Sequence, residues 1–398
     1  MPKPLLIVCT LVAFGVLLSG CRTKDEAVEL RPDYTRPLDP GENALREVRD
    51  PARFRALLES AHASNDALLI EAARRSDRWF EKPSAKTHFP IAGVSFERAD
   101  ESVDEMLKIL EKRPARDAFV REIMDKFTLY ESVGWDGHGT VLYTGYYAPE
   151  FEASREPSGE FLYPLYKRPA DLVTDPKTGK PLGRQVGSSV EPYPTRREID
   201  ESGMLAGTEL VWVKSPMDAY IIHVNGSAKL RLTDGSTMYI GYAGKTDRPY
   251  KGLGQTMIER DKIPAAGLNL TAVREYYDAH PEETLEMIYE NESYVFFTTY
   301  PADSWPAGSL GFRVTEKRSL ATDKAIFPRG GMLIVETRIP NYRGELRPFT
   351  QMMLDQDTGG AIKAPGRGDI FMGQGAAAEL LAGRQYQEGR LYYLFLKE

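Results

Sequence analysis

A short glycine-rich stretch near the C-terminus concentrates residues suited to acid–base chemistry. Residues 355–375 read DQDTGGAIKAPGRGDIFMGQG and hold three aspartates and six glycines. Glycine lets the backbone approach a ligand closely, so a carboxylate in such a stretch can lie beside a substrate without crowding. An ordinary turn rich in aspartate and glycine explains the same composition. The stretch therefore predicts either a turn or a carboxylate site, and the rest of the chain must decide.

Other residue types that carry catalysis or bind metals are scarce. The chain has two cysteines, Cys9 and Cys21, and five histidines without the spacing of zinc ligands on one helix face. Asp355 and Asp357 superficially resemble a carboxylate loop for a divalent cation, which is one alternative. No further acidic residue follows them at regular spacing. We therefore expect no metal and no cofactor.

The N-terminus has the pattern of an exported lipoprotein. An apolar run from Leu5 to Leu18 is too short to span a bilayer and ends in the letters LSGC, which resemble the lipobox of bacterial lipoproteins. This predicts a signal peptide over residues 1–20 and acylation of Cys21 by more than one chain, as stable anchoring requires. Arg22, in place of aspartate, favours the outer membrane, with the protein facing the periplasm. A cleaved secretory peptide with a chance cysteine is the alternative.

The composition excludes one class of partner. The formal net charge is −7, and loss of the signal peptide removes only Lys3, which leaves the remainder one unit more negative. Nucleic-acid binding needs a basic footprint, so we expect no nucleic acid. The 21 tyrosines and four tryptophans would suit a surface that stacks on sugar rings. At 398 residues the chain can fill two domains.

Hydrophobic periodicity separates a helical part from strand-rich parts. After a polar tether over residues 21–45, helices are expected at 50–61 and 66–80, from a capping box at Ser102–Glu105, over 119–127, and over 271–291 with a break at Pro281. Strands are expected at 140–147, 209–214, 219–224, 228–232, 237–244 (after an Asp234–Gly235 hairpin turn), 294–297, 331–337, 349–354 and 390–396. The absence of regular strand–helix alternation favours barrels over a doubly wound parallel sheet.

Several of these segments together resemble the membrane-bound lytic murein transglycosylase A family. The resemblance is carried by GYYAPEFEAS (145–154), the segment 218–254, the letters YVFF (294–297) and the C-terminal DTGGAIK…GD, and it covers about two thirds of the chain. Its most specific part is a three-aspartate module, which here comprises Asp323, Asp357 and Asp369.

The resemblance implies a fold that is mainly β with flanking helices. A double-psi β-barrel catalytic domain, with the N-terminal helices attached, would comprise residues 46–150 and 300–398. A smaller β-rich domain would be inserted over residues 151–299, and a groove between the two would take the glycan.

The resemblance also implies a lytic exotransglycosylase, a lyase that acts on peptidoglycan without water. Such enzymes cleave the β-1,4 bond between N-acetylmuramic acid and N-acetylglucosamine, and the C6 hydroxyl of the muramyl residue closes a 1,6-anhydro ring. Ordinary glycosidases need two carboxylates, whereas a nucleophile tethered to the sugar removes the need for one. Asp369 would then act as acid and afterwards as base, with its pKa raised by burial or by nearby charge. Asp323 and Asp357 would supply that charge or stabilise the transition state.

Further residues match the family's pattern at positions suited to substrate contact. Lys363 would order the loop, bind substrate, or lower the pKa of Asp369, and these readings stay open. Of Tyr146 and Tyr147, successive on a strand, at most one should face the sugar. The remaining candidates are Gly359, Gly360, Asn225 and Ser227. Relatives usually carry glutamine in place of Asn225. They also usually carry glycine in place of Ala364, a small change if the backbone angle there tolerates alanine, as we expect.

For some neighbouring residues, a purely structural explanation competes with a functional one. Lys245 and Tyr242 match the family, although a solvated turn lysine is the stronger explanation of Lys245. Arg318 would pair with one of the three aspartates or form a surface ion pair, and Asp355 looks like a strand end without a role.

Two rival functions remain beside the transglycosylase reading. A muramidase on the same barrel would use water, and a non-catalytic lipoprotein would only bind peptidoglycan. Glycan strands, outer-membrane lipid through acylated Cys21, and murein synthases or scaffold proteins are the partners expected. The residues themselves leave cleavage at glycan ends and at interior bonds both open.

Overall fold

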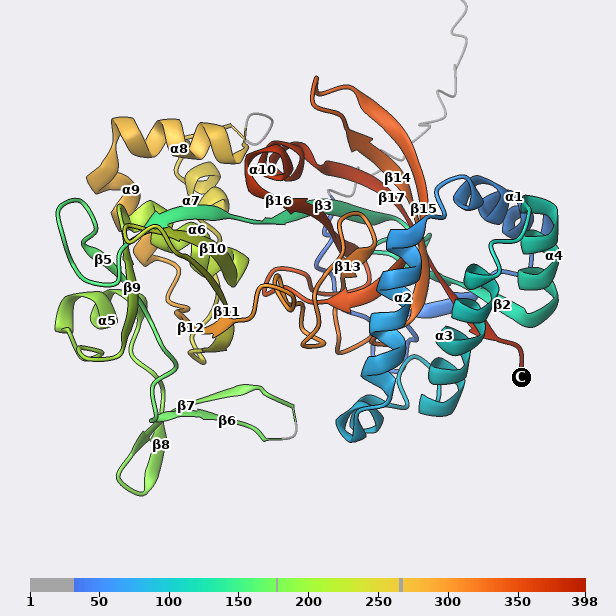
Figure 1. Ribbon diagram of the computed structural model, residues 1–398, viewed down its shortest axis with the longest axis horizontal. Helices are drawn as coiled ribbons and strands as arrows, with labels where there is room; N and C mark the ends of the chain where they lie inside the picture. The colour runs from blue at the N-terminus through green and yellow to red at the C-terminus, as the bar shows by residue number, and fades with distance from the viewer. Residues whose placement is uncertain (1–31, 177, 265–267) are drawn as a thin grey trace, which may run out of the picture. The chain divides into compact units, whose positions relative to one another are not determined.

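Six strands of the largest sheet pair in a ring. The computed structural model describes residues 32–398 except 177 and 265–267. The sheet order is β1 (Leu45–Glu47), β2 (Phe127–Ser132), β17 (Tyr386–Leu396), β14 (Met332–Pro340), β15 (Leu346–Asp357), β13 (Ser319–Ala321), β16 (Arg367–Gln374) and β3 (Val141–Ala148). Because β3 also pairs with β17, the pairings run in a closed order from β17 through β14, β15, β13 and β16 to β3 and back to β17. Figure 1 shows these strands in the part of the molecule that carries the N-terminal helices.

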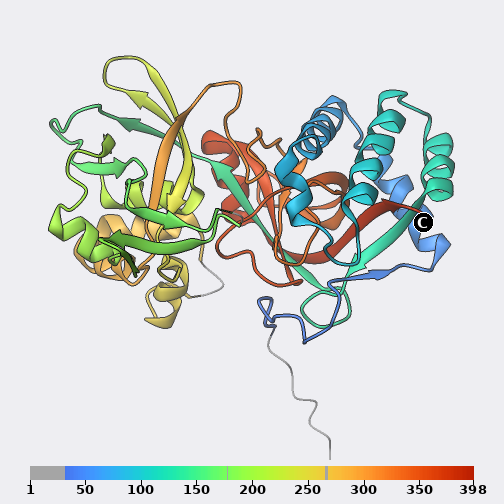
Figure 2. The ribbon, with the colours of Figure 1, turned by 90° about the horizontal axis from the view of Figure 1, so that it is seen from below.

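The N-terminal helices cover one face of this sheet. They are α1 (Pro51–His62), α2 (Ala67–Phe80), the short 3-10 helix η1 (Pro83–His88), α3 (Phe96–Glu111) and α4 (Arg116–Lys126). Asp50 caps α1 by accepting from the backbone N–H groups of Ala52 and Arg53, which confirms the predicted start at Pro51. Figure 2 shows the helices grouped on one side of the strands.

The third helix begins about two turns earlier than the capping box predicted. Ser95 caps it, with its side chain accepting from Arg98 N, and the prediction of a start at Ser102 is wrong. Ser102 is buried within the helix, donates its hydroxyl to the Arg98 carbonyl and accepts a 2.8 Å hydrogen bond from Leu396 N. The hydroxyl therefore fastens β17 to the helix layer.

Alternating side chains of the ring strands serve two hydrophobic cores. On β14, Met332 and Ile334 pack with residues of α1 to α4, whereas Leu333 and Val335 belong to the other core. This follows from the two-residue repeat of a strand, which sends neighbouring side chains to opposite faces. The buried positions along β17 divide in the same way.

A second group of sheets is formed by the middle of the chain. A four-stranded sheet contains β4 (Glu150–Ala153), β10 (Ser227–Leu232), β11 (Thr237–Lys245) and β12 (Val295–Tyr300), with the predicted turn at Asp234–Gly235 joining β10 to β11. The smaller sheets pair β5 (Tyr163–Tyr166) with β9 (Glu209–Val213), and β6 (Leu172–Thr174) with β7 (Pro181–Val186) and β8 (Ser189–Glu191). Figure 1 shows β6 to β8 as an arm that extends away from the rest.

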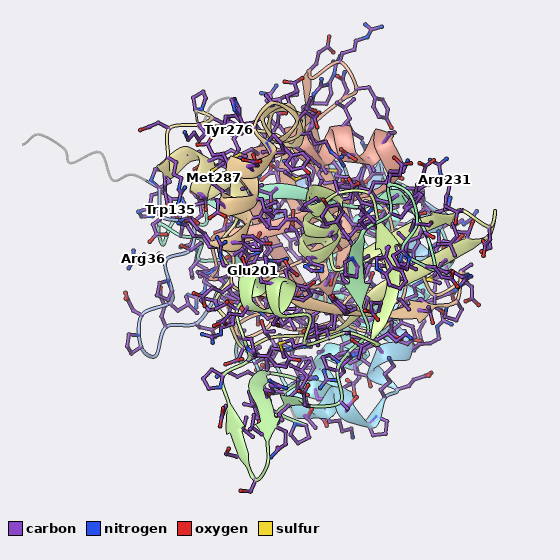
Figure 3. All side chains as sticks on the ribbon, turned by 90° about the vertical axis from the view of Figure 1, so that its left-hand side faces the viewer. Arg36, Trp135, Glu201, Arg231, Tyr276 and Met287 are labelled. Atoms are coloured by element: carbon purple, nitrogen blue, oxygen red, sulfur yellow. The ribbon has the colours of Figure 1, made fainter. Side chains whose placement is uncertain are left out.

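Five helices accompany these sheets. They are α5 (Arg196–Ser202), α6 (Pro216–Asn225), α7 (Leu253–Glu259), α8 (Leu270–Ala279) and α9 (Pro281–Tyr289), and α10 (Gly375–Arg384) follows later in the chain. The break at Pro281 is confirmed, since it separates α8 from α9. Figure 3 views this part of the molecule, with Glu201, Tyr276 and Met287 labelled on α5, α8 and α9.

One predicted strand is a helix. Residues 219–224 lie in α6, which is capped by Ser215, has Pro216 in its first turn and ends at Gly226 with φ +69°. A short apolar run does not distinguish a strand from a buried helix, and the cap, the proline and the glycine were the decisive signals. With ten α-helices and seventeen strands among its described residues, the protein is mixed rather than mainly β.

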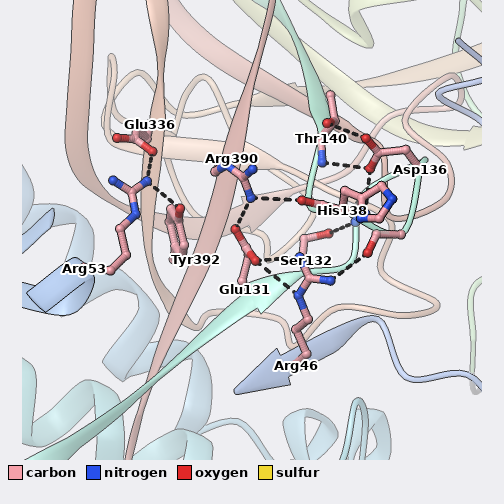
Figure 4. Close-up of polar contacts among 12 residues, drawn as sticks. Arg46, Arg53, Glu131, Ser132, Asp136, His138, Thr140, Glu336, Arg390 and Tyr392 are labelled. Atoms are coloured by element: carbon pink, nitrogen blue, oxygen red, sulfur yellow. Dashed lines mark hydrogen bonds and ion pairs between the residues drawn. The ribbon is translucent and has the colours of Figure 1, made fainter. Parts of the chain in front are cut away.

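Ion pairs fasten the N-terminal segments to the sheet. Glu131 on β2 lies 2.8 Å from Arg46 of β1 and 2.5 Å from Arg390 of β17. Arg53 of α1 contacts Glu336 on β14 and donates to the Tyr392 hydroxyl at 2.7 Å (Figure 4).

Arg318 has a structural role that differs from either interpretation of the sequence. It is only 3% exposed, donates to the Met352 carbonyl at 3.0 Å and to the Ser64 carbonyl, and lies 3.2 Å from Asp66. It pairs with none of the three aspartates of the module and is no surface residue. It joins the α1–α2 turn to β15 just before β13 begins.

We expect Arg318→Met to lower the free energy of unfolding by about 2–3 kcal/mol, because it leaves two buried carbonyls and one carboxylate without their donor. Urea unfolding measures the change. Arg121→Met, at an exposed position on α4, is the matched control and should stay within about 0.5 kcal/mol of the wild type. Equal midpoints for the two variants would contradict the assigned role.

Candidate active site

The shortest strand of the ring sets the positions of two aspartates. Ala321 on β13 pairs with Asp357 of β15 on one side and with Asp369 of β16 on the other. Neighbouring strands lie about 4.8 Å apart, so the two backbone positions are separated by about 10 Å. Their side chains must reach over β13 to act on one substrate.

Asp369 is the less hydrogen-bonded of the two. Its side chain is partly exposed and its Oδ1 accepts a 2.8 Å hydrogen bond from the Thr144 hydroxyl. Burial raises the pKa of Asp369 to about 7, while Thr144 and the charge of Arg367 oppose the rise and the charge of Asp357 adds to it. A large fraction of this carboxyl therefore carries a proton near neutral pH.

Asp357 has three hydrogen-bond donors. Tyr146 donates its hydroxyl to Oδ2 at 2.7 Å, and the backbone N–H groups of Ser309 and Thr358 donate to Oδ1 at 2.9 and 2.8 Å. Burial raises its pKa, and all three donors lower it. Ser309 reaches the carboxylate because residue 308 is glycine: a Cβ there would lie 3.3 Å from Cγ of Asp357 and 2.8 Å from the Gln356 carbonyl.

A single face of β3 serves both carboxylates. Thr144 and Tyr146 are two residues apart, so their side chains point the same way, and each donates its hydroxyl to one aspartate. Tyr147 points to the opposite face, is 5% exposed and packs in the hydrophobic core. Of the two tyrosines, only Tyr146 thus reaches the carboxylates.

Asp323 faces the backbone of the glycine-rich loop. It is 7% exposed and accepts hydrogen bonds from Ala325 N at 3.1 Å and from Ala364 N at 2.9 Å. Lys363 Nζ lies 4.0 Å from its Oδ1. The structure thus brings the three aspartates of the module around β13, with Asp323 fixing the loop that leads to Asp369.

Two family models match the chain. The model described as the MltA specific insert domain covers residues 142–298, and the one described as the 3D domain covers residues 318–395. The membrane-bound lytic murein transglycosylase A of Escherichia coli K12 is 31% identical over 270 residues, which are 67% of this chain and 68% of that protein. The enzyme of the same name from Vibrio cholerae is 32% identical over 66% of this chain and 68% of its own.

This chain belongs to the membrane-bound lytic murein transglycosylase A family.

Solved structures agree with that membership. A membrane-bound lytic murein transglycosylase from Agrobacterium tumefaciens superposes with a TM-score of 0.66 at 25% identity, covering 89% of this chain and 98% of the other. The E. coli MltA structure with bound chitohexaose shares the fold, with a TM-score of 0.61 at 23% identity over 92% of this chain and 96% of that one. The protein is therefore a lytic transglycosylase that cleaves peptidoglycan, a non-hydrolytic type of enzyme.

The remaining predicted contact residues of this transglycosylase lie in varied surroundings. Gly360 is exposed and its α-carbon faces the ring of Tyr250, and Gly359 lies against Ile362. Asn225 is the last residue of α6 and donates its amide to the Ile221 carbonyl at 2.8 Å, so its side chain serves the helix.

The structure shows the surroundings of three further residues that the sequence analysis named. Ser227 begins β10 and is 9% exposed. Lys245 ends β11 rather than standing in a solvated turn, and burial together with the charge of Lys363 lowers its pKa. Lys363 itself is exposed and lies nearer to Asp323 than the sequence could show.

Asp355, set aside as a strand end, has a clear structural role. It is fully buried, forms an ion pair with Lys324, and accepts hydrogen bonds from the Tyr393 hydroxyl at 2.8 Å and the Thr322 hydroxyl at 2.9 Å. Burial raises the pKa of Asp355 and lowers that of Lys324, and their mutual attraction opposes both shifts. Sequence reasoning missed Lys324, Thr144 and Ser309; only the hydroxyl of Thr144, two residues before Tyr146, offered a signal.

The described residues contain no cluster of three or more histidine, cysteine, aspartate or glutamate side chains arranged to hold a metal ion. The carboxylates around β13 face hydroxyl and backbone donors instead of one another. Such surroundings suit proton transfer better than metal binding.

Ala364 has φ +69°, a left-handed conformation that favours glycine, so the sequence-based expectation of an alanine-tolerant angle is wrong. We expect Ala364→Gly to be neutral or to stabilise the protein slightly. Ala361→Gly, in the same loop without a positive φ, should destabilise it, which leaves a difference of about 1 kcal/mol between the variants. Thermal unfolding measures both, and a more stable Ala361→Gly variant would contradict the strain.

Proposed function

We propose that Asp369 is the single acid–base residue of this transglycosylase and that the reaction leaves a 1,6-anhydromuramyl end. The protonated carboxyl donates its proton to the glycosidic oxygen between N-acetylmuramic acid and N-acetylglucosamine. The resulting carboxylate then takes the proton of the muramyl C6 hydroxyl as that oxygen attacks C1. No water enters the step, and the enzyme regains its starting protonation state.

The observation that carries this assignment is the contrast between the two carboxylates beside β13. Asp369 has one hydrogen-bond donor and a pKa raised to about 7, so it can give up a proton at neutral pH. Asp357 has three donors, which favour its charged form. Two titratable groups held in such different surroundings are suited to an acid role and a charge role.

The other module residues support Asp369 in this scheme. Asp357 supplies negative charge that raises the pKa of Asp369 and stabilises the oxocarbenium-like transition state. Asp323 positions the loop through Ala364, with Lys363 beside it. Gly359, Gly360 and Lys363 line the approach of the sugar, whereas Tyr146 acts through Asp357.

The proposed binding site for the glycan is a groove between two domains. Residues 46–150 and 300–398, which contain the six-stranded ring and the N-terminal helices, form the double-psi barrel domain. The β-rich segment 151–299 is inserted into it. Tyr250 of the inserted segment faces Gly360 of the catalytic loop, which supports a glycan groove where the two parts meet. The E. coli relative bound to chitohexaose, a β-1,4-linked sugar chain, supports a glycan ligand of this kind.

The proposed location is the periplasmic face of the outer membrane, with an acyl anchor at Cys21. Homologues are named membrane-bound, which supports an envelope location. Residue 21 lies outside the described residues. Within the described part of the chain, no helix combines the length and apolar character needed to cross a bilayer.

We expect Asp369→Asn to lower the release of anhydromuropeptides from purified sacculi by roughly a thousandfold, because the variant can neither give nor take the proton. Mass spectrometry of the digests measures it. Asp125→Asn, on the exposed face of α4, is the control and should keep full activity. Products one water heavier than anhydro sugars would indicate a muramidase instead, and no turnover by the wild type would indicate a binding protein.

The pH dependence of the reaction tests whether Asp369 acts in its protonated form. Since the acid must be protonated, kcat/KM should stay level up to about pH 7 and fall about tenfold per unit above it, following the pKa of Asp369. Thr144→Val removes the hydroxyl that stabilises the carboxylate, so the pKa rises and the basic limb should move to higher pH. A limb that stays in place in this variant would contradict the assignment.

A further inference from the structure

The tip of the β14–β15 hairpin exposes an unusual set of side chains. Tyr342 at the tip is 61% exposed and Tyr386 at the start of β17 is 62% exposed, more than the other large hydrophobic side chains of the described residues. Figure 1 shows this hairpin rising beyond α10. Tyrosine places an apolar ring and a polar hydroxyl side by side, which suits a boundary between water and an apolar phase.

Exposed arginines lie on both faces of the hairpin and at the adjacent end of α10, since Arg338 pairs with Pro348 and Arg347 with Ile339. Arg338, Arg343, Arg347 and Arg384 are all exposed, and together with Tyr342 and Tyr386 they form what we term the hairpin patch.

Contacts join the members of the patch. Arg384 donates to the Tyr342 carbonyl at 3.1 Å, and the Gln385 amide donates to the Arg338 carbonyl at 3.2 Å, which joins the end of α10 to the hairpin. Only Arg347 has a carboxylate partner among the described residues, namely Glu345. Three guanidinium groups thus stand unneutralised on a chain whose formal charge is −7.

The first described residues of the chain lie beside this patch. Tyr34 donates its hydroxyl to Glu388 at 2.8 Å, two residues after Tyr386 on β17. Tyr34 follows Cys21 by thirteen residues, a length that spans at most about 45 Å when fully extended. An anchor at Cys21 would therefore hold Tyr34, beside the patch, within about 45 Å of the lipid surface.

We propose that the hairpin patch docks on the headgroups of anionic phospholipids in the membrane that carries the anchor. Guanidinium groups bind phosphate oxygens through paired hydrogen bonds, and the two tyrosines lie at the headgroup level. Each arginine near an anionic surface strengthens binding about fivefold. The orientation rests on the proposed anchor at Cys21, whereas the lipid affinity of the patch does not.

The test uses the mature chain with Cys21→Ser, so that acylation cannot cause the binding. We expect it to sediment with vesicles of phosphatidylcholine and phosphatidylglycerol at 7:3, and much less with phosphatidylcholine alone. Tyr342→Ser with Arg343→Glu should weaken binding to the mixed vesicles more than about tenfold, because the pair removes one ring and reverses one charge. Both side chains are exposed, so the fold should persist.

The matched control is Leu162→Ser with Arg121→Glu, which also removes one exposed apolar side chain and reverses one exposed arginine. It should bind like the parent. Equal binding by patch and control variants, or no preference for anionic vesicles, would overturn the proposal. So would a patch variant that loses binding to sacculi but not to vesicles, because the patch would then recognise glycan.

This test is independent of catalysis. None of the patch residues contacts Asp369 or Asp357, so the patch variant should release anhydromuropeptides from soluble glycan strands at the wild-type rate. If the anhydro product is absent from the wild type as well, the proposed reaction fails while the vesicle result stands. If only vesicle binding fails, the reaction stands.

Discussion

The site depends on one face of β3, which donates a hydroxyl to each of two carboxylates on different strands. Asp357 and Asp369 are held apart by β13, whose Ala321 pairs with both. Thr144 and Tyr146 lie two residues apart on β3 and reach one aspartate each. Since the strand repeat fixes the separation of these donors, it also limits the separation of the carboxylates. The four strands concerned are consecutive neighbours in the sheet, in the order β15, β13, β16 and β3.

The two carboxylates differ in the hydrogen bonds that they accept. Both are largely removed from water, and burial raises both pKa values. Three donors to Asp357 oppose that effect in part, and one of them, the Ser309 N–H, requires the close approach that Gly308 allows. Asp369 accepts one side-chain hydrogen bond, and burial raises its pKa to about 7. The contrast between the two carboxylates thus lies in their donors, of which the backbone supplies two of the three at Asp357.

Much of the fold could be read from local signals, and the failures have local causes. Asp50–Pro51, Asp234–Gly235 and Pro281 each fix a backbone conformation in a way that tertiary contacts seldom overrule, and all three positions behave as predicted. The prediction of a strand at 219–224 was wrong because apolar residues without clear periodicity suit either a strand or a buried helix. Ser102 resembles a cap, but its hydroxyl is needed by β17, a contact between residues almost three hundred positions apart.

The site was predictable in its residue types but not in its pairings. A resemblance could assign Asp323, Asp357 and Asp369, since each belongs to a short motif. It could not assign Thr144 or Lys324, because their partners lie on other strands and only the folded register brings them together. The same limit applies to Asn225, whose amide is occupied by its own helix.

The pair Asp355 and Asp357 shows why composition alone leaves the glycine-rich stretch ambiguous. In a regular strand, residues two apart share a face, so both aspartates would be expected at the site. The register between β13 and β15 shifts at this point: Leu320 pairs with Asp355 and Ala321 with Asp357. The extra residue, Gln356, forms a β-bulge, which changes the directions of the neighbouring side chains.

Side chains hold that bulge in place from both sides. The Gln356 amide donates to the Ala72 carbonyl at 2.7 Å and its oxygen accepts from Ser319 at 2.6 Å, while Asp355 is held by Lys324. A buried ion pair is costly to form and adds little net stability, so its value here lies in fixing the register. The Asp355 carboxylate is thereby buried in the core, and the Asp357 carboxylate is left partly exposed beside Asp369. The position of the Asp357 carboxylate on β15 thus depends on Asp355, which takes no part in the proposed reaction.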